Sequence, residues 1–494
     1  MRMPEPDRST IARAPDIVAR LRGLLAPESV IVDLDGLRPY ETDGLTAYRT
    51  VPLCVVLPET TAEVAAVLKA CAEMDVKVVP RGGGTSLSGG ALPLADGVIL
   101  GLSKFKRILN IDLENRCAVV QPGVTNLAIT DAVAADGWYY APDPSSQIAC
   151  TIGGNVAENS GGLHCLKYGM TTNNILGVEF VLMDGTILRL GGKHCDAEGY
   201  DLLGIITGSE GLLGVVTEVT VRLLRRPETQ RALLLGFDSN EAGGLCVARV
   251  IGAGIIPAAM EMMDRDAIRA VEEFCHAGYP LDVEALLIVE VDGPPAEVDH
   301  LIAVIGKIAD DCGARVKRES RSEVERVAIW SGRKNALAAV GRITPDFYVV
   351  DGTIPRGRLP EILARIAALA KKHGLACANV FHAGDGNLHP MIMYDANKGE
   401  VETAEAFGND ILLACVEVGG VLTGEHGVGV EKRDLMGAMF DETDLAHQQR
   451  IKCAFDPAGH LNPGKVFPTL HRCAELGRLH VHGGALPFPN LPRF

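Results

Sequence analysis

Four glycine-rich turns, all within one stretch of about 140 residues, constrain the fold of this chain more than any other feature. They occupy residues 80–90, 141–146, 151–162 and 207–216, and the first of them reads PRGGGTSLSGG. Successive glycines let several backbone N–H groups converge on one anion, and hydroxyl side chains add further donors. One such turn could be a plain surface loop. Four turns in one domain favour an extended ligand that is contacted along its length, such as a dinucleotide.

Motifs and composition exclude several classes of protein. The first turn is neither a P-loop nor the G-x-G-x-x-G fingerprint with its following helix. The net charge of −16 argues against nucleic acid or an anionic membrane surface as a partner. Thirteen cysteines include no C-x-x-C pair, which argues against a self-contained iron–sulfur cluster. Because there is neither an apolar leader nor a run of about 18 apolar residues, we expect a cytoplasmic chain without a transmembrane segment.

The pattern of apolar residues changes near residue 228. Before it, short strand-like runs alternate with glycine turns, and after it strand-like runs alternate with amphipathic helical stretches. A chain of 494 residues is also too long for a single core. We therefore predict an α+β protein made of an N-terminal helical segment (1–50), a cofactor domain (51–227), a second domain with an antiparallel sheet (228–429), a C-terminal helical segment (430–470) and a tail (471–494).

Two histidines flank a candidate hairpin turn in the second domain. Strand-like runs at 375–382 and 388–394 are separated by a short turn, in which an Asp-Gly pair suits a two-residue loop. With that loop His382 faces His389 directly, and the Cβ atoms of such cross-strand neighbours lie about 4.5–5.5 Å apart. Both imidazoles are then close enough to hold one divalent ion. A register shift of one residue would place them on opposite faces of the sheet.

A third ligand is expected to be acidic and to come from elsewhere in the chain. Glu425 stands in a glycine-bounded turn after a helical run at 409–418. Two histidines and one carboxylate leave a coordination position open, which is typical of a catalytic site and suits Zn²⁺, Mn²⁺ or Fe²⁺. The alternative is that the histidines form a stacked surface pair and that Glu425 is a solvated turn residue.

The segments that contain the four glycine turns resemble the vanillyl-alcohol oxidase and p-cresol methylhydroxylase (PCMH) superfamily of flavoproteins. Within it they resemble the branch of glycolate oxidase D subunits and FAD-linked D-lactate dehydrogenases. The resemblance extends from about residue 20 to residue 470. The resemblance implies a PCMH-type FAD-binding domain of two α+β subdomains and a ferredoxin-like substrate domain with an antiparallel sheet. Some members attach flavin to a histidine in the first glycine loop. That loop has only Gly82, Gly83 and Gly84 here, so FAD is expected to be non-covalent.

The resemblance also implies which residues contact FAD. The loop 81–86 would cradle the pyrophosphate, residues 153–159 would lie near the flavin, and residues 210–216 would lie near the adenosine side. The implied cofactor residues are Arg81, Gly82, Gly83, Gly84, Thr85, Ser86, Gly89, Pro142, Asp143, Ser145, Gly153, Gly154, Asn155, Asn159, Gly162, Glu210, Gly214, Val215, Val216 and Asn462.

Matching positions give roles to residues of the second domain. His382, His389 and Glu425 would bind a divalent cation that contacts the hydroxyl and carboxylate of the substrate. His426 matches the residue thought to remove the hydroxyl proton, with a fourth metal ligand as the alternative role. Arg333 matches the carboxylate-binding arginine, and its planar fork suits a bidentate contact.

The implied activity is an FAD-dependent dehydrogenase that oxidises a small 2-hydroxy monocarboxylate, glycolate or D-lactate, to the 2-oxo acid by hydride transfer. This is the activity of the catalytic subunit of glycolate oxidase. Relatives acting on 2-hydroxyglutarate carry a lysine just before the aspartate that is Asp351 here. Because Val349 and Val350 stand there instead, a 2-hydroxyglutarate dehydrogenase is disfavoured.

A bound flavin is also compatible with two functions that are not dehydrogenation. One is a non-catalytic subunit that only transfers electrons, and the other is a group-exchange enzyme like the ether-lipid synthases, which lack the metal hairpin. The expected partner of a dehydrogenase is an electron acceptor, such as a second flavin-type subunit together with an iron–sulfur subunit. Through such partners the chain could lie at the periphery of the inner membrane.

Overall fold

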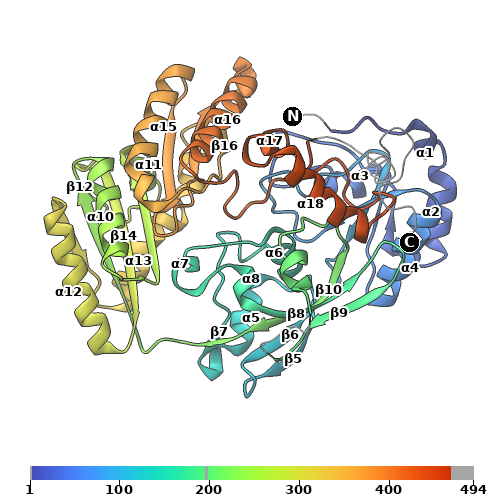
Figure 1. The fold of residues 1–494 in the computed structure, drawn as a ribbon, viewed down its shortest axis with the longest axis horizontal. Helices are drawn as coiled ribbons and strands as arrows, with labels where there is room; N and C mark the ends of the chain where they lie inside the picture. The colour runs from blue at the N-terminus through green and yellow to red at the C-terminus, as the bar shows by residue number, and fades with distance from the viewer. Residues whose placement is uncertain (1–2, 195–198, 469–494) are drawn as a thin grey trace.

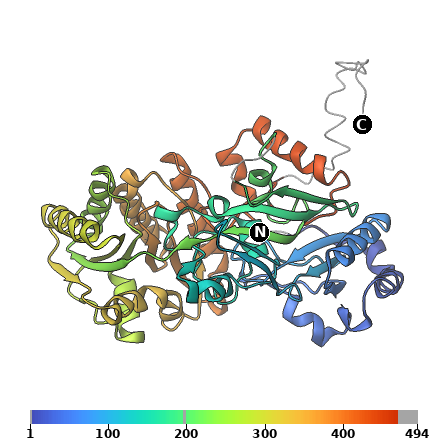
Figure 2. The same ribbon diagram turned by 90° about the horizontal axis from the view of Figure 1, so that it is seen from below.

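Two sheets and a small two-stranded pair form the N-terminal part of the chain, and one larger sheet forms the central part (Figure 1). The computed structural model describes residues 3–194 and 199–468. Figure 2 shows the two parts side by side along the long axis, the N-terminal part in blue to green and the central part in yellow-green to orange. The arrangement matches the α+β architecture expected from the sequence.

The first sheet is mainly parallel and carries the first glycine turn at its edge. Helix α4 (Thr61–Glu73) connects two of its strands and begins at a capping box between Thr60 and Glu63. Its apolar face is fully buried, as the helical period predicts. In order of pairing, the strands are β1 (Val30–Ile31), β2 (Cys54–Val56), β4 (Gly97–Gly101) and β3 (Lys77–Arg81).

The second sheet is antiparallel and packs under helices that carry two more glycine turns. Its strands, in order, are β5 (Ile108–Asp112), β6 (Cys117–Val120), β10 (Val215–Arg222), β8 (Ile175–Val181) and β9 (Ile187–Gly191). A small pair is formed by β7 (Trp138–Tyr139) and β11 (Leu224–Arg225). The other helices of this part are α1 (Arg8–Ala12), α2 (Ala14–Arg22), α3 (Leu34–Leu37), α5 (Asn126–Val133), α6 (Ile152–Glu158), α7 (Cys165–Tyr168), α8 (Thr171–Asn174) and α9 (Leu202–Ile206).

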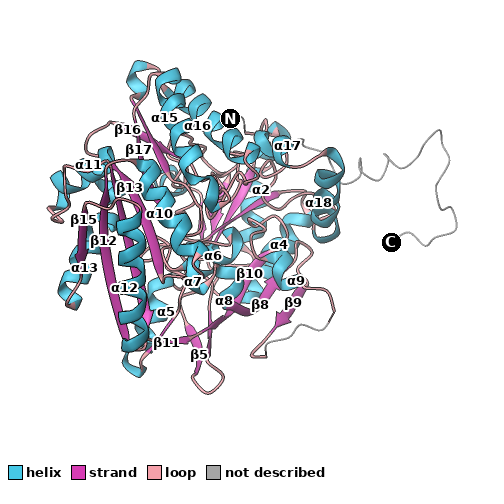
Figure 3. Cartoon of the chain, turned by 60° about the vertical axis from the view of Figure 1, so that its left-hand side comes forward, coloured by secondary structure: helices cyan, strands magenta, loops and turns pink. Residues whose placement is uncertain are grey.

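The central part is built on a seven-stranded antiparallel sheet. Its strands, in order, are β15 (Val316–Glu319), β12 (Thr229–Phe237), β14 (Ala285–Gly293), β13 (Ala259–Asp264), β17 (Cys377–His382), β18 (Pro390–Tyr394) and β16 (Asp346–Val349). The helices around it are α10 (Asn240–Gly252), α11 (Arg265–Cys275), α12 (Pro295–Asp311), α13 (Glu323–Lys334), α14 (Ala336–Val340), α15 (Leu359–His373) and α16 (Val401–Glu417). Figure 3 shows its long strands between these helices.

Both faces of this sheet are covered. Leu233 and Leu235 pack with α10, α12, α15 and α16 in one core, whereas Leu234 packs with α11, α13 and α14 in another. Alternate residues of a strand point to opposite faces, so β12 contributes to both cores. Because both faces of the central sheet are buried, its strands are nearly continuous apolar runs. A charged residue inside one of these strands requires a local partner.

The histidine hairpin forms, but the predicted turn is wrong. Asn379 pairs with Pro390 and His382 bridges to Asn387, so four residues (383–386) form the loop instead of two. The register is therefore shifted by two residues from the expected one. Because side chains alternate with a period of two, a shift of two leaves both histidines on the same face. They are diagonal neighbours rather than opposite ones, with ring centroids 5.0 Å apart.

The C-terminal segment returns to the first sheet after α17 (Met436–Met439) and α18 (Glu442–Phe455), drawn in red in Figure 1. Leu461 bridges to Val78 in parallel, and the backbone N–H of Asn462 donates to the Val78 carbonyl (2.8 Å). The expected tail at 471–494 lies outside the described residues. None of the helices described is both long and apolar enough to cross a bilayer.

Candidate active site

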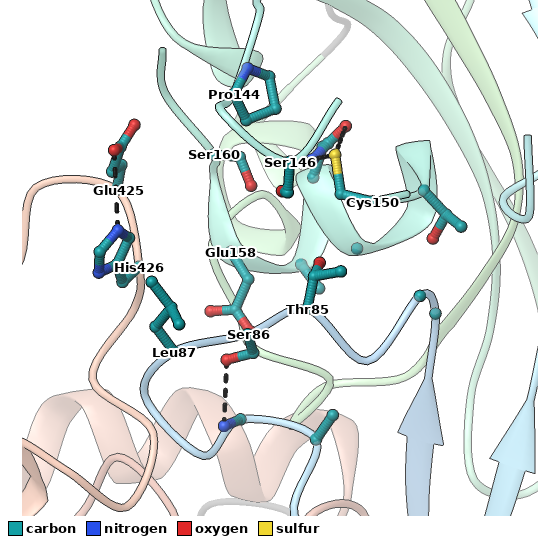
Figure 4. Close-up of a pocket in the computed structure, with 18 of the residues that line it drawn as sticks. Thr85, Ser86, Leu87, Pro144, Ser146, Cys150, Glu158, Ser160, Glu425 and His426 are labelled. Atoms are coloured by element: carbon teal, nitrogen blue, oxygen red, sulfur yellow. Dashed lines mark hydrogen bonds and ion pairs between the residues drawn. The ribbon is translucent and has the colours of Figure 1, made fainter. Parts of the chain in front are cut away.

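A cavity of about 460 Å³ lies where the glycine turns of the N-terminal part meet the central sheet. In Figure 4, Glu425 and His426 stand on one side of it, across from Thr85, Pro144 and Ser146. The expected cofactor residues that line it are Arg81, Gly82, Gly83, Gly84, Thr85, Ser86, Ser145, Gly153, Gly154, Asn155, Glu210, Gly214, Val215 and Val216. Arg333, His389, Glu425 and His426 line the same cavity. Turns that are far apart in sequence thus face one space together with the predicted catalytic residues.

The first glycine loop is held from behind by its own arginine. Nη1 of Arg81 donates to the Thr42 carbonyl (2.7 Å), and the guanidinium lies over the Tyr40 ring at 5.6 Å. Burial lowers the pKa of Arg81, against the attraction of Asp43. The guanidinium therefore fastens the N-terminal segment to the loop. Backbone N–H groups and the hydroxyl of Thr85 are left to meet an anion.

Six of the expected cofactor residues do not line the cavity, and the structure gives them other contacts. Asn159 has φ 52° at the end of α6, where its Oδ1 accepts from Thr172 N. Asn462 donates to the carbonyls of Gly90 and Glu210. The others are Gly89, Pro142, Asp143 and Gly162. Their direct contact with FAD stays a prediction, and Asn462 holds together two residues that line the cavity, Gly90 and Glu210.

Gly153 lines the cavity and offers a test of where FAD binds. A Cβ at this position would lie 2.5 Å from Pro122 Cβ and 3.1 Å from its carbonyl, so alanine must push α6 away from Pro122. Overpacking of this kind costs about 1–3 kcal/mol, and we expect Gly153→Ala to raise the dissociation constant of FAD about 10-fold. Titration of the apoprotein with FAD measures it.

The control is Gly252→Ala, at the end of α10, where no described atom lies within 4 Å of the added Cβ. This variant should bind FAD as the wild type does, with stability unchanged or slightly higher. Wild-type FAD affinity in Gly153→Ala would contradict the placement of the flavin against α6.

The three predicted metal ligands lie together, and two of them, His389 and Glu425, line the cavity, whereas His382 does not. Nε2 of His382 and Nε2 of His389 lie 3.4 and 3.2 Å from Oε1 of Glu425. Among the described residues, neither nitrogen makes a hydrogen bond, although both are buried. Buried polar atoms normally have partners, so these two nitrogens beside a carboxylate form a set of donors that suits a cation. The three ligand atoms all lie within 4.8 Å of one another, as one ion requires.

A second set, Asp351, His389 and His426, has the same spacing but suits a metal less well. The Asp351 carboxylate is fully buried and accepts from Asn387 Nδ2 (2.8 Å), Thr423 Oγ1 (2.5 Å) and the backbone N–H of His426 (3.0 Å). Its lone pairs are therefore already used within the chain. Asp351 shapes the turn that presents Glu425 and His426.

The two neighbouring residues of that turn, Glu425 and His426, differ sharply in how their surroundings shift the pKa. Burial alone would raise the pKa of Glu425, but His382 and His389 hold it well below its usual value, so the carboxylate is ionised. Burial lowers the pKa of His426 to about 4, against the attraction of Asp351. His426 is therefore neutral near pH 7, and its ring stacks on His389 with centroids 5.0 Å apart. A neutral imidazole has a free lone pair, with which it can accept a proton.

Arg333 comes to the cavity from the last turn of α13. Its side chain is buried, and its Nε and Nη2 both reach Oε2 of Glu261 at 2.8 Å. The neighbouring Lys334 is exposed and also lines the cavity. A fixed guanidinium beside a candidate metal site gives the cavity an anion-binding end.

Models of two protein domain families match this chain. Residues 52–191 match the model for an FAD binding domain, and residues 226–466 match the model for the C-terminal domain of FAD linked oxidases. The chain is 54% identical to glycolate oxidase subunit GlcD of Escherichia coli over 494 residues, which is 100% of this chain and 98% of the relative. The chain belongs to the FAD-linked oxidase family. It is an FAD-dependent oxidoreductase.

Further relatives of this FAD-linked oxidase are more distant. Glycolate oxidase subunit GlcD of Bacillus subtilis is 38% identical over 92% of this chain and 97% of the relative. D-lactate dehydrogenase of Archaeoglobus fulgidus is 33% identical over 88% of this chain and 96% of the relative. A solved 4-ethylphenol oxidase from Gulosibacter chungangensis covers 96% of this chain and 100% of its own, with a TM-score of 0.79 and 19% identity. A solved p-cresol methylhydroxylase covers 93% of this chain and 97% of its own, with a TM-score of 0.74 and 18% identity, and these two likenesses confirm the PCMH-type fold.

Two buried acids of this FAD-linked oxidase, Asp351 and Glu261, were not predicted from the sequence as parts of the site, and a third, Glu210, was predicted only as a cofactor residue. Glu210 was expected beside the adenosine, yet its carboxylate accepts the backbone N–H groups of Val428 and Gly429 at 2.7 Å each, beside the His426 turn. Asp351 accepts the backbone N–H of His426 in that turn, and Glu261 accepts from the Nε of Arg333. The one signal for Glu261 in the sequence was an acid inside an apolar strand, which demands a partner but does not name it.

Proposed function

We propose that this FAD-linked oxidase oxidises a small 2-hydroxy monocarboxylate, glycolate or D-lactate, to the corresponding 2-oxo acid. The observation that carries the proposal is the single cavity lined by the glycine turns, by Arg333, and by His389 and Glu425 of the candidate metal cluster. The names of the relatives, glycolate oxidase subunit and D-lactate dehydrogenase, support the same class of substrate.

The two bound groups would have separate positions in the cavity. The glycine turns would hold FAD, and His382, His389 and Glu425 would hold a divalent ion, Zn²⁺, Mn²⁺ or Fe²⁺. When bound, FAD supplies a hydride acceptor and the ion lowers the pKa of the substrate hydroxyl.

The residues of the chain would orient the substrate between these groups. Arg333 would bind the carboxylate and fix the direction of the α-hydrogen. His426 would accept the hydroxyl proton, because its ring is neutral near pH 7 and lines the cavity. Val349, Val380 and Met391 form an apolar wall that displaces water from the reacting atoms. Relatives acting on a 2-hydroxy diacid carry a lysine just before the aspartate that is Asp351 here, and the two valines at 349 and 350 therefore favour a monocarboxylate.

Anaerobic reduction of the bound flavin tests the proposal directly. We expect glycolate or D-lactate to bleach the visible absorption of the purified protein, and D-2-hydroxyglutarate to do so much more weakly. Acetate, which lacks the hydroxyl, is the control and should leave the flavin oxidised. A flavin that no 2-hydroxy acid bleaches would refute the proposal and favour a subunit that only transfers electrons. If D-2-hydroxyglutarate alone bleached the flavin, the substrate would be 2-hydroxyglutarate and not a monocarboxylate.

The reduced flavin must pass its electrons on. We propose a protein partner as acceptor, in line with the word subunit in the names of two relatives. A second flavin-type subunit with an iron–sulfur subunit is the candidate, and such an assembly could lie at the periphery of the inner membrane. Co-purification of the tagged chain with such subunits from its own host would support this assignment.

A further inference from the structure

Glu261 is a fully buried acid in the middle of strand β13. The antiparallel pairing of β13 with β17 sets it directly opposite His382. Its Oε1 lies 2.8 Å from Nδ1 of His382. A buried carboxylate requires partners, and here the register of the sheet provides the first of them.

The second partner is Arg333. Nε and Nη2 of its guanidinium both lie 2.8 Å from Oε2, the other oxygen of Glu261. Arginine is always a donor, since its guanidinium stays protonated and has no acceptor atom. Glu261 therefore joins a candidate metal ligand to the candidate carboxylate anchor, using one oxygen for each.

The contact to His382 has a consequence for the ring. A carboxylate only accepts hydrogen bonds, so Nδ1 must carry a proton, and the nitrogen left to bind a cation through its lone pair is Nε2. Nε2 is the nitrogen that faces Glu425 and His389. A carboxylate behind a ligand histidine fixes its tautomer and raises its basicity toward a metal.

We propose that Glu261 is a positioning residue that holds His382 in its metal-binding tautomer and Arg333 in its substrate-binding orientation. The inference rests on the metal site of the proposed function. Because the Nε edge of Arg333 is occupied by Glu261, the substrate carboxylate meets the Nη1 end of the guanidinium. The distance between ion and anion site is then set by one rigid side chain on a central strand.

Two substitutions separate this role from simple packing. Glu261→Gln keeps the size of the side chain but has only one acceptor for two donors. The amide oxygen must turn to Arg333, which cannot accept, and the amide N–H then donates to Nδ1 of His382. The proton of the ring moves to Nε2 and blocks the metal. Glu261→Asp is shorter, but it keeps the charge and both acceptor oxygens.

The experiment is a Zn²⁺ titration of the FAD-bound protein after removal of metal with a chelator, followed with a competing zinc indicator. Loss of the partner of a ligand histidine costs about 10- to 100-fold in metal affinity. We expect Glu261→Gln to weaken Zn²⁺ binding by at least this factor, and Glu261→Asp to fall between Gln and wild type. A packing role predicts the opposite order, because Asp leaves a cavity and Gln does not.

Glu290 provides a matched control on the adjacent strand. It is also fully buried, and it accepts from His164 Nε2 (3.2 Å), Arg326 Nη1 (2.8 Å) and Trp330 Nε1 (2.5 Å). Its histidine faces Asp143 and not the candidate ligands. Glu290→Gln should lower the melting temperature but leave the affinity for Zn²⁺ as in the wild type.

The outcomes are distinct. Wild-type Zn²⁺ affinity in Glu261→Gln, an affinity of Glu261→Asp no higher than that of Glu261→Gln, or an equal loss in Glu290→Gln, would overturn the role of Glu261 alone. A wild-type protein that binds no divalent ion would overturn the metal site of the proposed function, and the role of Glu261 with it. Flavin bleaching of that same wild-type protein by glycolate would still support the oxidase activity.

Discussion

Replacing His382 with alanine is expected to remove the bound metal and to lower turnover at least about 10³-fold, which corresponds to ~4 kcal/mol of transition-state stabilisation. Two ligands remain, His389 and Glu425, and they cannot hold the ion firmly or leave the hydroxyl polarised. FAD should stay bound, because His382 does not line the cavity with the glycine turns. Metal content by elemental analysis, flavin content and kcat on the same preparation measure the effect.

His373→Ala is the control for this substitution. His373 lies at the end of α15, stacks on Phe407 with centroids 5.3 Å apart, and is 2.8 Å from an oxygen of Asp410. Its loss removes a half-buried imidazole away from the cavity and should leave metal content and kcat unchanged. An active His382→Ala protein without metal would rule out the metal-assisted mechanism.

Arg333→Met is expected to lower kcat/KM for the 2-hydroxy acid about 10²- to 10³-fold, mainly through KM. Truncating one partner of a buried, hydrogen-bonded charge pair costs about 2–5 kcal/mol, and here both the substrate carboxylate and Glu261 lose their cation. Steady-state kinetics over a range of substrate concentrations separates KM from kcat. The visible spectrum of the flavin checks that FAD remains bound.

Lys334→Met tests whether any cation at this end of the cavity is sufficient. Lys334 is adjacent in sequence and lines the same cavity, but its side chain is exposed and solvated. A solvated charge contributes little to binding, and we expect less than about a five-fold change in kcat/KM. If Lys334→Met were the more damaging substitution, the carboxylate anchor would be Lys334 and the assignment of Arg333 would be wrong.

Local patterns in the sequence were sufficient to predict much of the fold. The period of α4, the apolar strands of the central sheet and the change near residue 228 all follow from side-chain spacing. The loop length of the hairpin could not be predicted from side-chain spacing. An Asp-Gly pair is compatible with a two-residue loop and with the four-residue loop that forms. Both registers put His382 and His389 on one face, so the two histidines were correctly predicted to be neighbours although the predicted turn was wrong.

The supporting residues of the site could not be predicted in the same way. Glu261 meets His382 across 121 positions of sequence and Arg333 across 72. Glu210 reaches the His426 turn across 218. Such contacts depend on how sheets and helices pack in three dimensions, and no local period encodes them. An acid in a buried strand signals that a partner exists, but only the assembled fold identifies it.

The return of the C-terminal segment to the first sheet determines when during synthesis the cofactor pocket can be completed. Nζ of Lys465 donates to the carbonyls of Gly90 and Leu92 (2.8 and 2.7 Å), and Asn462 joins Gly90 to Glu210. The first glycine loop therefore leaves the ribosome hundreds of residues before the groups that fasten it. The hydrogen bonds of Asn462 and Lys465 to this loop can therefore form only after residues 462–465 have been synthesised.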